Sequence, residues 1–529
     1  MAIDKNAIGY QVYIKSFFDS NNDGIGDLNG ITKKLDYIKN LGVNFIWICP
    51  FYDSPMDDNG YDIRNYYEID KIYGNMDDLK NLIEEAHKRK IKVVIDLVMN
   101  HTSDENEWFI KSEQNIKPYT DYYIWKDGKI KNGKLTPPNN WQSFFSGSAW
   151  GYSEKRKQYF LKIFSKKMPD LNYENDKVFD EMEKVISFYS NLNIDGFRVD
   201  AIAHIGKDQT YKNAKNIKKT YKSFSNLPNT HKYLKRFNKI FKKYDMTTMG
   251  ELGGNPNKND IKEYTTCGEL DMIFSFEQIS VFNKNHTINL KKLLKTLKYK
   301  NQITKNGGNS ILFWLNHDYP RLKSKVKNEN DSFNAQICLA GLMYMLDGTP
   351  IIYNGEELGM ENYPYSSINE FKDVNAKMFY ENSNDKEKAL EFLKDNSRDN
   401  SRTIMQWSDS KNAGFSRTEP WNFVGKNYKL VNAKIEETQN NSMLSEYRKI
   451  LKTRKENIDF INNGKYKFYQ KNAILGYFIE NNTQKLIILA NFGKNSKKLS
   501  LKNYQVVYSN KTLNNKEILP YQLLILKSK

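Results

Sequence analysis

The chain has 529 residues, of which 39% are hydrophobic, so it can bury a large core divided among roughly two to four domains. Its net charge of +18 would suit a nucleic-acid binder, but the lysines are spread evenly and no basic block accompanies a nucleic-acid motif. No apolar run approaches the roughly 18 residues that a membrane span needs. We therefore expect neither a nucleic-acid nor a membrane partner.

Eight short apolar or aromatic runs alternate with longer helical patterns, as in βα units that build a parallel sheet. In chain order these candidate strands are 10–17, 45–49, 93–99, 196–199, 247–250, 272–276, 311–316 and 350–353. The segments 31–41 and 76–90 carry apolar residues at three-to-four spacing, which is typical of amphipathic helices. The pattern predicts an α/β fold, a (β/α)8 TIM barrel.

Two stretches depart from this pattern. Residues 103–170 are rich in Trp, Tyr, Asn, Gly and Pro and show no clear helix, which predicts an inserted subdomain after the third strand rather than one long loop. From about residue 464, polar and apolar residues alternate, which predicts antiparallel strands. We therefore assign 1–102 and 171–455 to the barrel, 103–170 to the insertion and 456–529 to a C-terminal β-sandwich.

Polar and ionisable side chains follow four of the predicted strands. Strands three, four, five and seven lead into Asn100-His101, Asp200, Glu251 and His317-Asp318, respectively. Barrel enzymes carry their catalytic groups at the C-terminal ends of the strands, so these side chains are predicted to meet at one mouth. A single Asp at a strand end is about as often an ordinary ion-pair partner, but the set on four strands favours a catalytic site.

The carboxyl groups suggest a specific chemistry. Retaining glycosidases use an ionised and a protonated carboxyl group roughly 5 to 5.5 Å apart. Arg198 precedes Asp200 by two residues, so both side chains point to the same face, where the cation would keep Asp200 ionised. Glu251 lies beside glycines, where drier surroundings would raise its pKa. This predicts Asp200 as nucleophile and Glu251 as general acid/base.

Segments along most of the chain resemble a known family. Four of them, DLVMNH (96–101), GFRVD (196–200), GE (250–251) and NHD (316–318), resemble the signature regions of the α-amylase superfamily, glycoside hydrolase family 13. Five more resemble its oligo-1,6-glucosidase and α-glucosidase branch: GIGDLNG (24–30), DNGYD (58–62), MPDLNYEN (168–175), GTPIIYNGEELG (348–359) and SRDNSR (397–402).

The resemblance implies residue roles. Asp200 would form the covalent intermediate, Glu251 would protonate the leaving oxygen, and Asp318 would clamp sugar hydroxyls. The glucose subsite would also be lined by His101, Arg198 and His317.

The resemblance further implies how the pocket closes behind one glucose. Asp62 and an arginine of the 397–402 segment would hold the non-reducing-end hydroxyl, which gives exo action. Of Arg398 and Arg402 we favour Arg402, the alternative being that it only braces the loop.

The segment 19–27 resembles a metal-binding loop. It spaces oxygen ligands every two residues around a glycine turn, like the first half of an EF-hand, but lacks that motif's bidentate Glu. In the resembled branch this loop binds calcium, which implies a structural Ca2+ held by Asp19, Asn21, Asp23, Ile25 and Asp27. Magnesium or an empty hydrogen-bonded turn are the alternatives. No organic cofactor is expected, because no Gly-rich phosphate loop is present.

The linkage that is cleaved depends on one small residue. Ala201 follows the predicted nucleophile where branch members restricted to α-1,6 bonds tend to carry Val, so a retaining exo-α-glucosidase that prefers α-1,4 bonds in short oligosaccharides or disaccharides is expected. The alternatives are an oligo-1,6-glucosidase, a sucrose or trehalose-6-phosphate hydrolase, or a transglycosylase. A non-catalytic carbohydrate-binding relative is the alternative of a different class, although such proteins usually lose a carboxylate.

Cysteine usage bears on the compartment. Cys49, Cys267 and Cys338 are odd in number and form no Cys-x-x-Cys pair, which favours free thiols in a reducing environment. The first residues carry no charged-then-apolar leader. We expect a cytoplasmic protein that is a monomer or a weak oligomer.

Overall fold

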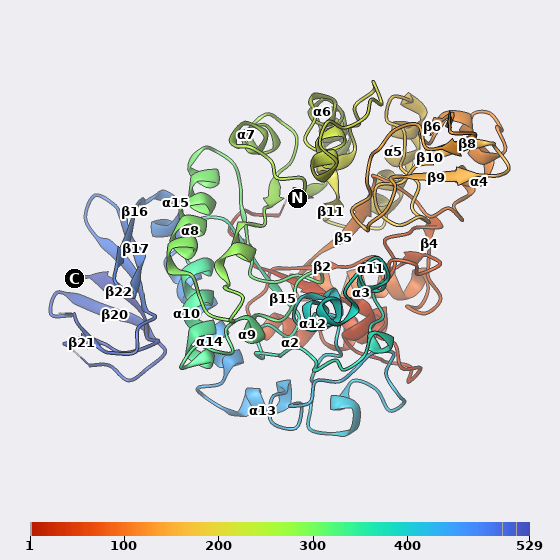
Figure 1. The fold of residues 1–529 in the computed structure, drawn as a ribbon. Helices are drawn as coiled ribbons and strands as arrows, with labels where there is room; N and C mark the ends of the chain where they lie inside the picture. Colours follow the sequence, from red (N-terminus) through yellow and green to blue (C-terminus); the bar gives the residue numbers. More distant parts are fainter. Residues whose placement is uncertain (1–2, 500, 515) are drawn as a thin grey trace.

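Eight parallel strands form the central sheet of the computed structural model, which describes residues 3–499, 501–514 and 516–529. Their order is β13-β12-β11-β5-β2-β1-β15-β14. A parallel bridge between Ile273 and Ser310 brings the two edge strands together, so the sheet closes into a barrel (Figure 1). The predicted (β/α)8 fold is confirmed.

The barrel strands coincide with the predicted segments. They are β1 (Gly9–Val12), β2 (Phe45–Ile48), β5 (Lys92–Val98), β11 (Gly196–Asp200), β12 (Thr247–Glu251), β13 (Met272–Phe274), β14 (Ile311–Leu312) and β15 (Thr349–Tyr353). The first strand is shorter than predicted, because the chain turns into a 3-10 helix at Ile14–Ser16, where the Phe17 amide bonds to the Ile14 carbonyl.

Side chains on these strands alternate between two environments. Trp47 packs in the barrel interior with Met249 and Phe313, whereas Ile46 and Ile48 belong to the larger core beneath the helices. This core is covered by helices that include α1 (Leu28–Lys33), α2 (Leu35–Asn40), α3 (Met76–Lys88), α5 (Asp176–Asn191), α6 (Pro228–Lys243), α7 (Lys258–Thr266), α8 (Leu290–Lys305), α10 (Ser332–Tyr344) and α14 (Met443–Glu456). The two predicted helices correspond to α1–α2 and α3.

The inserted segment carries its own small sheets, at the upper right of Figure 1. Strands β6 (Trp125–Lys126), β10 (Gln158–Leu161) and β9 (Trp150–Ser153) form one antiparallel sheet, and β7 (Lys129–Lys131) pairs with β8 (Lys134–Thr136). The segment also contains the helix α4 (Glu107–Glu113), so the expectation of no helix was wrong. Asn106 caps this helix, whose two turns are too short to show a clear period.

The C-terminal region forms the antiparallel sheet that was predicted, at the left of Figure 1. Its five strands are β16 (Lys465–Lys471), β17 (Ile474–Glu480), β18 (Lys485–Asn491), β22 (Leu523–Ser528) and β20 (Tyr504–Ser509), in that order. A second pair, β19 (Lys497–Lys498) and β21 (Glu517–Ile518), packs Ile518 against Leu524 and Leu526. The short helix α15 (Ile458–Asn463) lies between α14 and β16.

Within the described part of the chain, no helix is both long enough and apolar enough to cross a membrane.

Candidate active site

The strand register sets the two candidate catalytic carboxylates side by side. Strands β11 and β12 pair Val199 with Gly250, so Asp200 and Glu251 follow at the same level on neighbouring strands. Neighbouring strands lie about 4.8 Å apart. This spacing matches the short carboxyl separation of retaining glycosidases rather than the longer one of inverting enzymes.

One buried guanidinium joins three carboxylates at this level. Arg198 Nη1 lies 2.6 Å from Asp96 Oδ1 and 2.5 Å from Asp200 Oδ1, and its Nη2 lies 2.9 Å from Glu251 Oε2. The arginine side chain is 1% exposed, so these contacts are shielded from solvent. Asp96 was not named as a site residue from the sequence, although it lies in the DLVMNH segment. Its side chain fixes the arginine that contacts both catalytic candidates.

The two catalytic candidates differ in pKa. Burial raises the pKa of Asp200 to about 6, and the positive charge of Arg198 opposes that rise. Burial raises the pKa of Glu251 to about 7, again opposed by Arg198. Glu251 therefore holds its proton at a higher pH than Asp200, which is the division between acid and anion that the two proposed roles require.

Asp318 and His317 complete the polar wall from the seventh strand. His317 Nε2 lies 3.3 Å from Asp318 Oδ2, and its Nδ1 lies 2.8 Å from the Gln11 amide nitrogen. The His317 ring stacks on Tyr61, with ring centroids 5.2 Å apart. Burial favours a raised pKa for Asp318, but His317, Arg398 and Arg402 together hold it below its usual value. Asp318 is therefore an anion throughout the working pH range.

These side chains line a cavity of about 220 Å³, which we call the central cavity. Its lining comprises Asp58, Tyr61, His101, Phe145, Phe164, Met168, Asp200, Ala201, Glu251, His317, Asp318, Asn375 and Arg398. The cavity brings together all three predicted catalytic residues and both predicted histidines. Three of the lining residues, Phe145, Phe164 and Met168, come from the inserted segment.

The Asp and Arg residues that line the cavity are not the pair chosen from the sequence. Asp58 and Arg398 line the cavity and form a 2.7 Å ion pair, whereas Asp62 and Arg402 do not line it. Asp62 is fully buried, and its carboxylate accepts the backbone N–H groups of Asp57 and Asp58.

Arg402 lies behind the cavity wall. Its Nε donates to the His317 carbonyl, and its guanidinium contacts Asp318 and Asp373. These contacts fit the alternative that Arg402 braces the loop. The DNGYD and SRDNSR segments both reach the cavity, through Asp58 and Arg398 rather than through Asp62 and Arg402.

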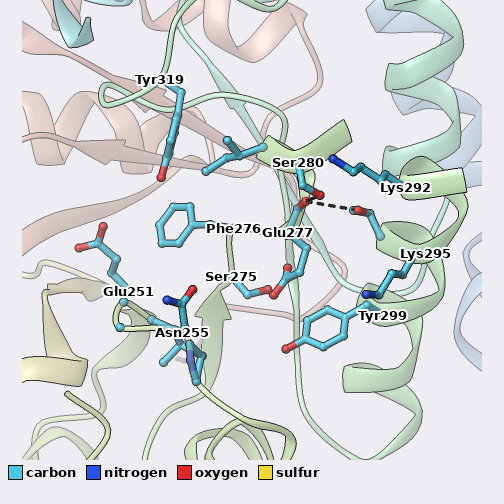
Figure 2. A pocket seen from close by; sticks show the side chains of 16 residues that line it. Glu251, Asn255, Ser275, Phe276, Glu277, Ser280, Lys292, Lys295, Tyr299 and Tyr319 are labelled. Atoms are coloured by element: carbon cyan, nitrogen blue, oxygen red, sulfur yellow. Dashed lines mark hydrogen bonds between the residues drawn. The ribbon is translucent and has the colours of Figure 1, made fainter. Parts of the chain in front are cut away.

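Two larger cavities flank the central one. The first, of about 760 Å³, is reached past Glu251, and Figure 2 shows Phe276 and Tyr319 beside it, with Glu277, Lys292, Lys295 and Tyr299 beyond. The second, of about 570 Å³, shares Asp318 with the central cavity and is lined by Phe282, Trp314 and Phe392. Tyr319 lines both flanking cavities.

The predicted metal loop directs its oxygens to its own backbone. Asp19 accepts the N–H groups of Asn22 and Gly24, and Asp27 accepts those of Ser20 and Gly30. In the described ranges, no three His, Cys, Asp or Glu side chains gather as metal ligands. Carboxylate, amide and carbonyl oxygens such as those of this loop are the ligands that calcium prefers.

Paired carboxylates, an arginine and a sugar-sized cavity at the mouth of a barrel are typical of a glycoside hydrolase of the α-glucosidase type. The model for the α-amylase catalytic domain matches residues 11–464. The chain is 39% identical to an oligo-1,6-glucosidase of Bacillus cereus, over 99% of each chain. Among solved structures, it matches a trehalose-6-phosphate hydrolase of Bacillus licheniformis with a TM-score of 0.91 and 37% identity, and the isomaltulose synthase of Protaminobacter rubrum with a TM-score of 0.91 and 35% identity. Each match covers 99% of both chains.

The chain belongs to the α-amylase family, glycoside hydrolase family 13. The named relatives act on linkages other than the α-1,4 bond that Ala201 suggested, so they favour the alternatives to that expectation. The non-catalytic alternative is set aside, because the chain is a glycoside hydrolase.

Proposed function

We propose that this chain is an exo-acting, retaining α-glucosidase that releases single glucose units from disaccharides and short oligosaccharides, with α-1,6 and α-1,1 bonds preferred over α-1,4. The observation that carries the proposal is the 220 Å³ cavity, which has Asp200, Glu251 and Asp318 in its wall together with the Asp58–Arg398 pair. A cavity of this size accepts about one sugar unit, and in the proposal the Asp58–Arg398 pair blocks a longer chain. The linkage preference rests on the relatives.

In the proposed mechanism, Asp200 attacks the anomeric carbon while Glu251 donates its proton to the leaving oxygen. The glycosidic bond breaks, and a covalent glucosyl ester forms on Asp200. Glu251, now ionised, removes a proton from water, which attacks the same carbon and releases α-glucose. Arg198 contacts both carboxylates and stabilises the charge that moves between them.

The flanking cavities then receive the part of the substrate that leaves. Glu251 lies at the passage between the central and first flanking cavities, where an acid must stand to protonate the leaving oxygen. Tyr319 and Phe276 offer flat apolar faces to a sugar ring at this point (Figure 2).

The test is hydrolysis of isomaltose, trehalose 6-phosphate, maltose and sucrose by the wild type and by Asp200→Asn, with the released anomer followed by NMR. We expect initial α-glucose, faster turnover of isomaltose or trehalose 6-phosphate than of maltose, and loss of turnover in the variant. Initial β-glucose would refute retention, and a preference for maltose would restore the α-1,4 assignment. Products larger than the substrate would indicate transglycosylation.

We also propose, from residue types alone, that the loop 19–27 takes up Ca2+ after rearrangement and that the protein works in the cytoplasm as a monomer or weak oligomer. Ligand binding to the native state alone stabilises it by about 2.7 kcal/mol at one hundred times Kd. A melting temperature that rises with Ca2+ and falls with EGTA would support the metal.

The proposed compartment rests on the cysteines. All three are free, in keeping with a reducing compartment.

A further inference from the structure

We propose that Lys207 is a positioning residue that fixes His101 as a hydrogen-bond donor toward the sugar in the central cavity. Lys207 follows the 3-10 helix Ile202–His204 that comes after β11, and its side chain is only 1% exposed. Its effect on turnover rests on the proposed function, whereas its effect on the hydrogen bonding of His101 can be measured without any substrate.

The Lys207 ammonium faces three oxygen atoms from separate parts of the chain. Its Nζ lies 2.8 Å from Asn100 Oδ1 and 3.1 Å from Asp170 Oδ2, and it also donates to the His204 carbonyl. Asn100 and Asp170 are fully buried. A buried cation needs such partners, because it has lost its hydration. The ammonium thus joins the end of the third strand, the end of the insertion and the loop after the fourth strand.

This contact orients the Asn100 amide. An ammonium only donates hydrogen bonds, so the Asn100 atom that faces Lys207 must be the carbonyl oxygen. The amide nitrogen then faces the opposite way, where it lies 3.2 Å from His101 Nδ1 and 3.2 Å from Asp170 Oδ1. Lys207, together with the Asp170 carboxylate that accepts from this nitrogen, therefore determines which end of the amide meets the histidine.

The orientation of Asn100 in turn decides where the His101 ring carries its hydrogen. The amide nitrogen only donates, so Nδ1 of His101 accepts and the hydrogen is on Nε2. Burial lowers the pKa of His101 to about 3, and Lys207 lowers it further, so the ring is neutral and has one N–H; a weaker contact with the Tyr61 backbone opposes this shift. The Nε2 atom is buried and makes no hydrogen bond of ordinary geometry to a described residue.

His101 lies in the wall of the central cavity with Asp200 and Glu251, so its Nε2–H is available to a sugar oxygen. Without the ammonium, the Asn100 amide can turn its oxygen toward Nδ1, which moves the hydrogen to Nδ1. The ring then presents a lone pair to the cavity, and a sugar hydroxyl or a developing charge loses its donor.

The test uses the fact that the chain contains only six histidines, so that ¹⁵N-labelled imidazoles can be resolved and His101 assigned with the variant His101→Gln. In the wild type we expect a protonated Nε2 and an unprotonated Nδ1. In Lys207→Met we expect population of the Nδ1–H form and a fall in kcat/KM of about tenfold or more, mainly in kcat. An unchanged His101 pattern in Lys207→Met overturns the proposal, even if activity is lost.

Arg454→Met is the matched control for the loss of a buried cation. Arg454 is fully buried against the carbonyls of Tyr344 and Gly348, away from the residues that line the central cavity. We expect a lower melting temperature, with the His101 pattern and kcat/KM unchanged below the transition. A His101 pattern that shifts equally in this control overturns the specific role of Lys207.

If Lys207→Met does not fold, Asn100→Asp provides the second variant. It keeps an oxygen toward Lys207 but replaces the amide donor with an acceptor, so the His101 hydrogen is expected on Nδ1. Retention of Nε2–H in Asn100→Asp overturns the proposal. If the wild type hydrolyses no α-glucoside, the proposed function fails, but the imidazole spectra still decide the role of Lys207.

Discussion

Asp58 and Arg398 are 340 positions apart in the sequence, yet they form a 2.7 Å ion pair in the wall of the central cavity. The Arg398 guanidinium also contacts Asp373, at 2.5 Å, and Asp318, at 3.4 Å. Its guanidinium carbon lies 5.3 Å from the ring centre of Phe145, in the inserted segment. The pair therefore links the loop after β2, the segment after α12 (Lys386–Asn396) and the insertion in the wall of the cavity.

Replacing Asp58 with Asn should weaken glucose binding in the central cavity. Truncating one partner of a buried charge pair costs about 2 to 5 kcal/mol, so we expect kcat/KM to fall by about thirtyfold or more. Steady-state kinetics with isomaltose measures this fall. The control is Asp62→Asn, for which we expect a lower melting temperature but kcat/KM within about threefold of the wild type, because Asp62 bonds backbone amides only. The reverse pattern would restore Asp62 as the sugar-binding residue.

The pH dependence of kcat/KM should be bell-shaped. Asp200 must lose its proton to act as nucleophile, so activity rises through its pKa of about 6. Glu251 must keep its proton to act as acid, so activity falls above its pKa of about 7. The two limbs belong to the coupled pair rather than to either residue alone. Stopped assays between pH 4 and 9 test this expectation, and a plateau that extends to pH 9 would contradict the assignment of Glu251.

The buried carboxyl group of Glu356 should make the free energy of unfolding depend on pH. Burial raises the pKa of Glu356 to about 8, although the hydroxyls of Tyr344 and Tyr447 donate to its Oε1. The folded state therefore holds a proton that the unfolded state loses near the usual pKa of a glutamate. The free energy of unfolding falls as pH rises from that value to about 8.

The variant Glu356→Gln keeps the carbonyl acceptor and removes the titration. We expect its free energy of unfolding to fall less than that of the wild type between pH 5 and 8.5. One proton contributes at most about 1.4 kcal/mol per pH unit to this difference. Urea unfolding at several pH values provides the measurement. Parallel pH dependences in the two proteins would show that Glu356 does not carry the proton.

The residue after the nucleophile should influence linkage preference. Ala201 lines the central cavity with a φ of 47°, and its amide donates to Glu251 Oε2 at 3.1 Å. Ala201→Val adds two methyl groups in a backbone conformation that β-branched residues avoid, so we expect a lower melting temperature. We also expect kcat/KM for maltose to fall more than that for isomaltose. An unchanged ratio of the two would remove Ala201 as a determinant of linkage.

The sequence by itself determined the barrel and its chemistry. All eight strands and the two helices singled out could be predicted, because hydrophobic period is a local property that a parallel sheet converts directly into position. It could also be predicted that Asp200, Glu251 and Asp318 lie at the same end of the barrel, because the C-terminal ends of barrel strands share one mouth. The short helix α4 was missed because two turns are too few to show a period.

Only the tertiary structure decided which loop residues face the central cavity. Three residues separate Asp58 from Asp62, and two of them, Asn59 and Gly60, have positive φ. This turn sends one carboxylate to the cavity and the other toward backbone amides. Arg398 and Arg402 likewise share one segment and two partners, Asp318 and Asp373, but only Arg398 lines the cavity. Loop side chains have no fixed period, so their direction depends on what the rest of the chain packs against them. The same holds for Lys207, whose three oxygen partners come from separate parts of the chain and meet only in the folded protein.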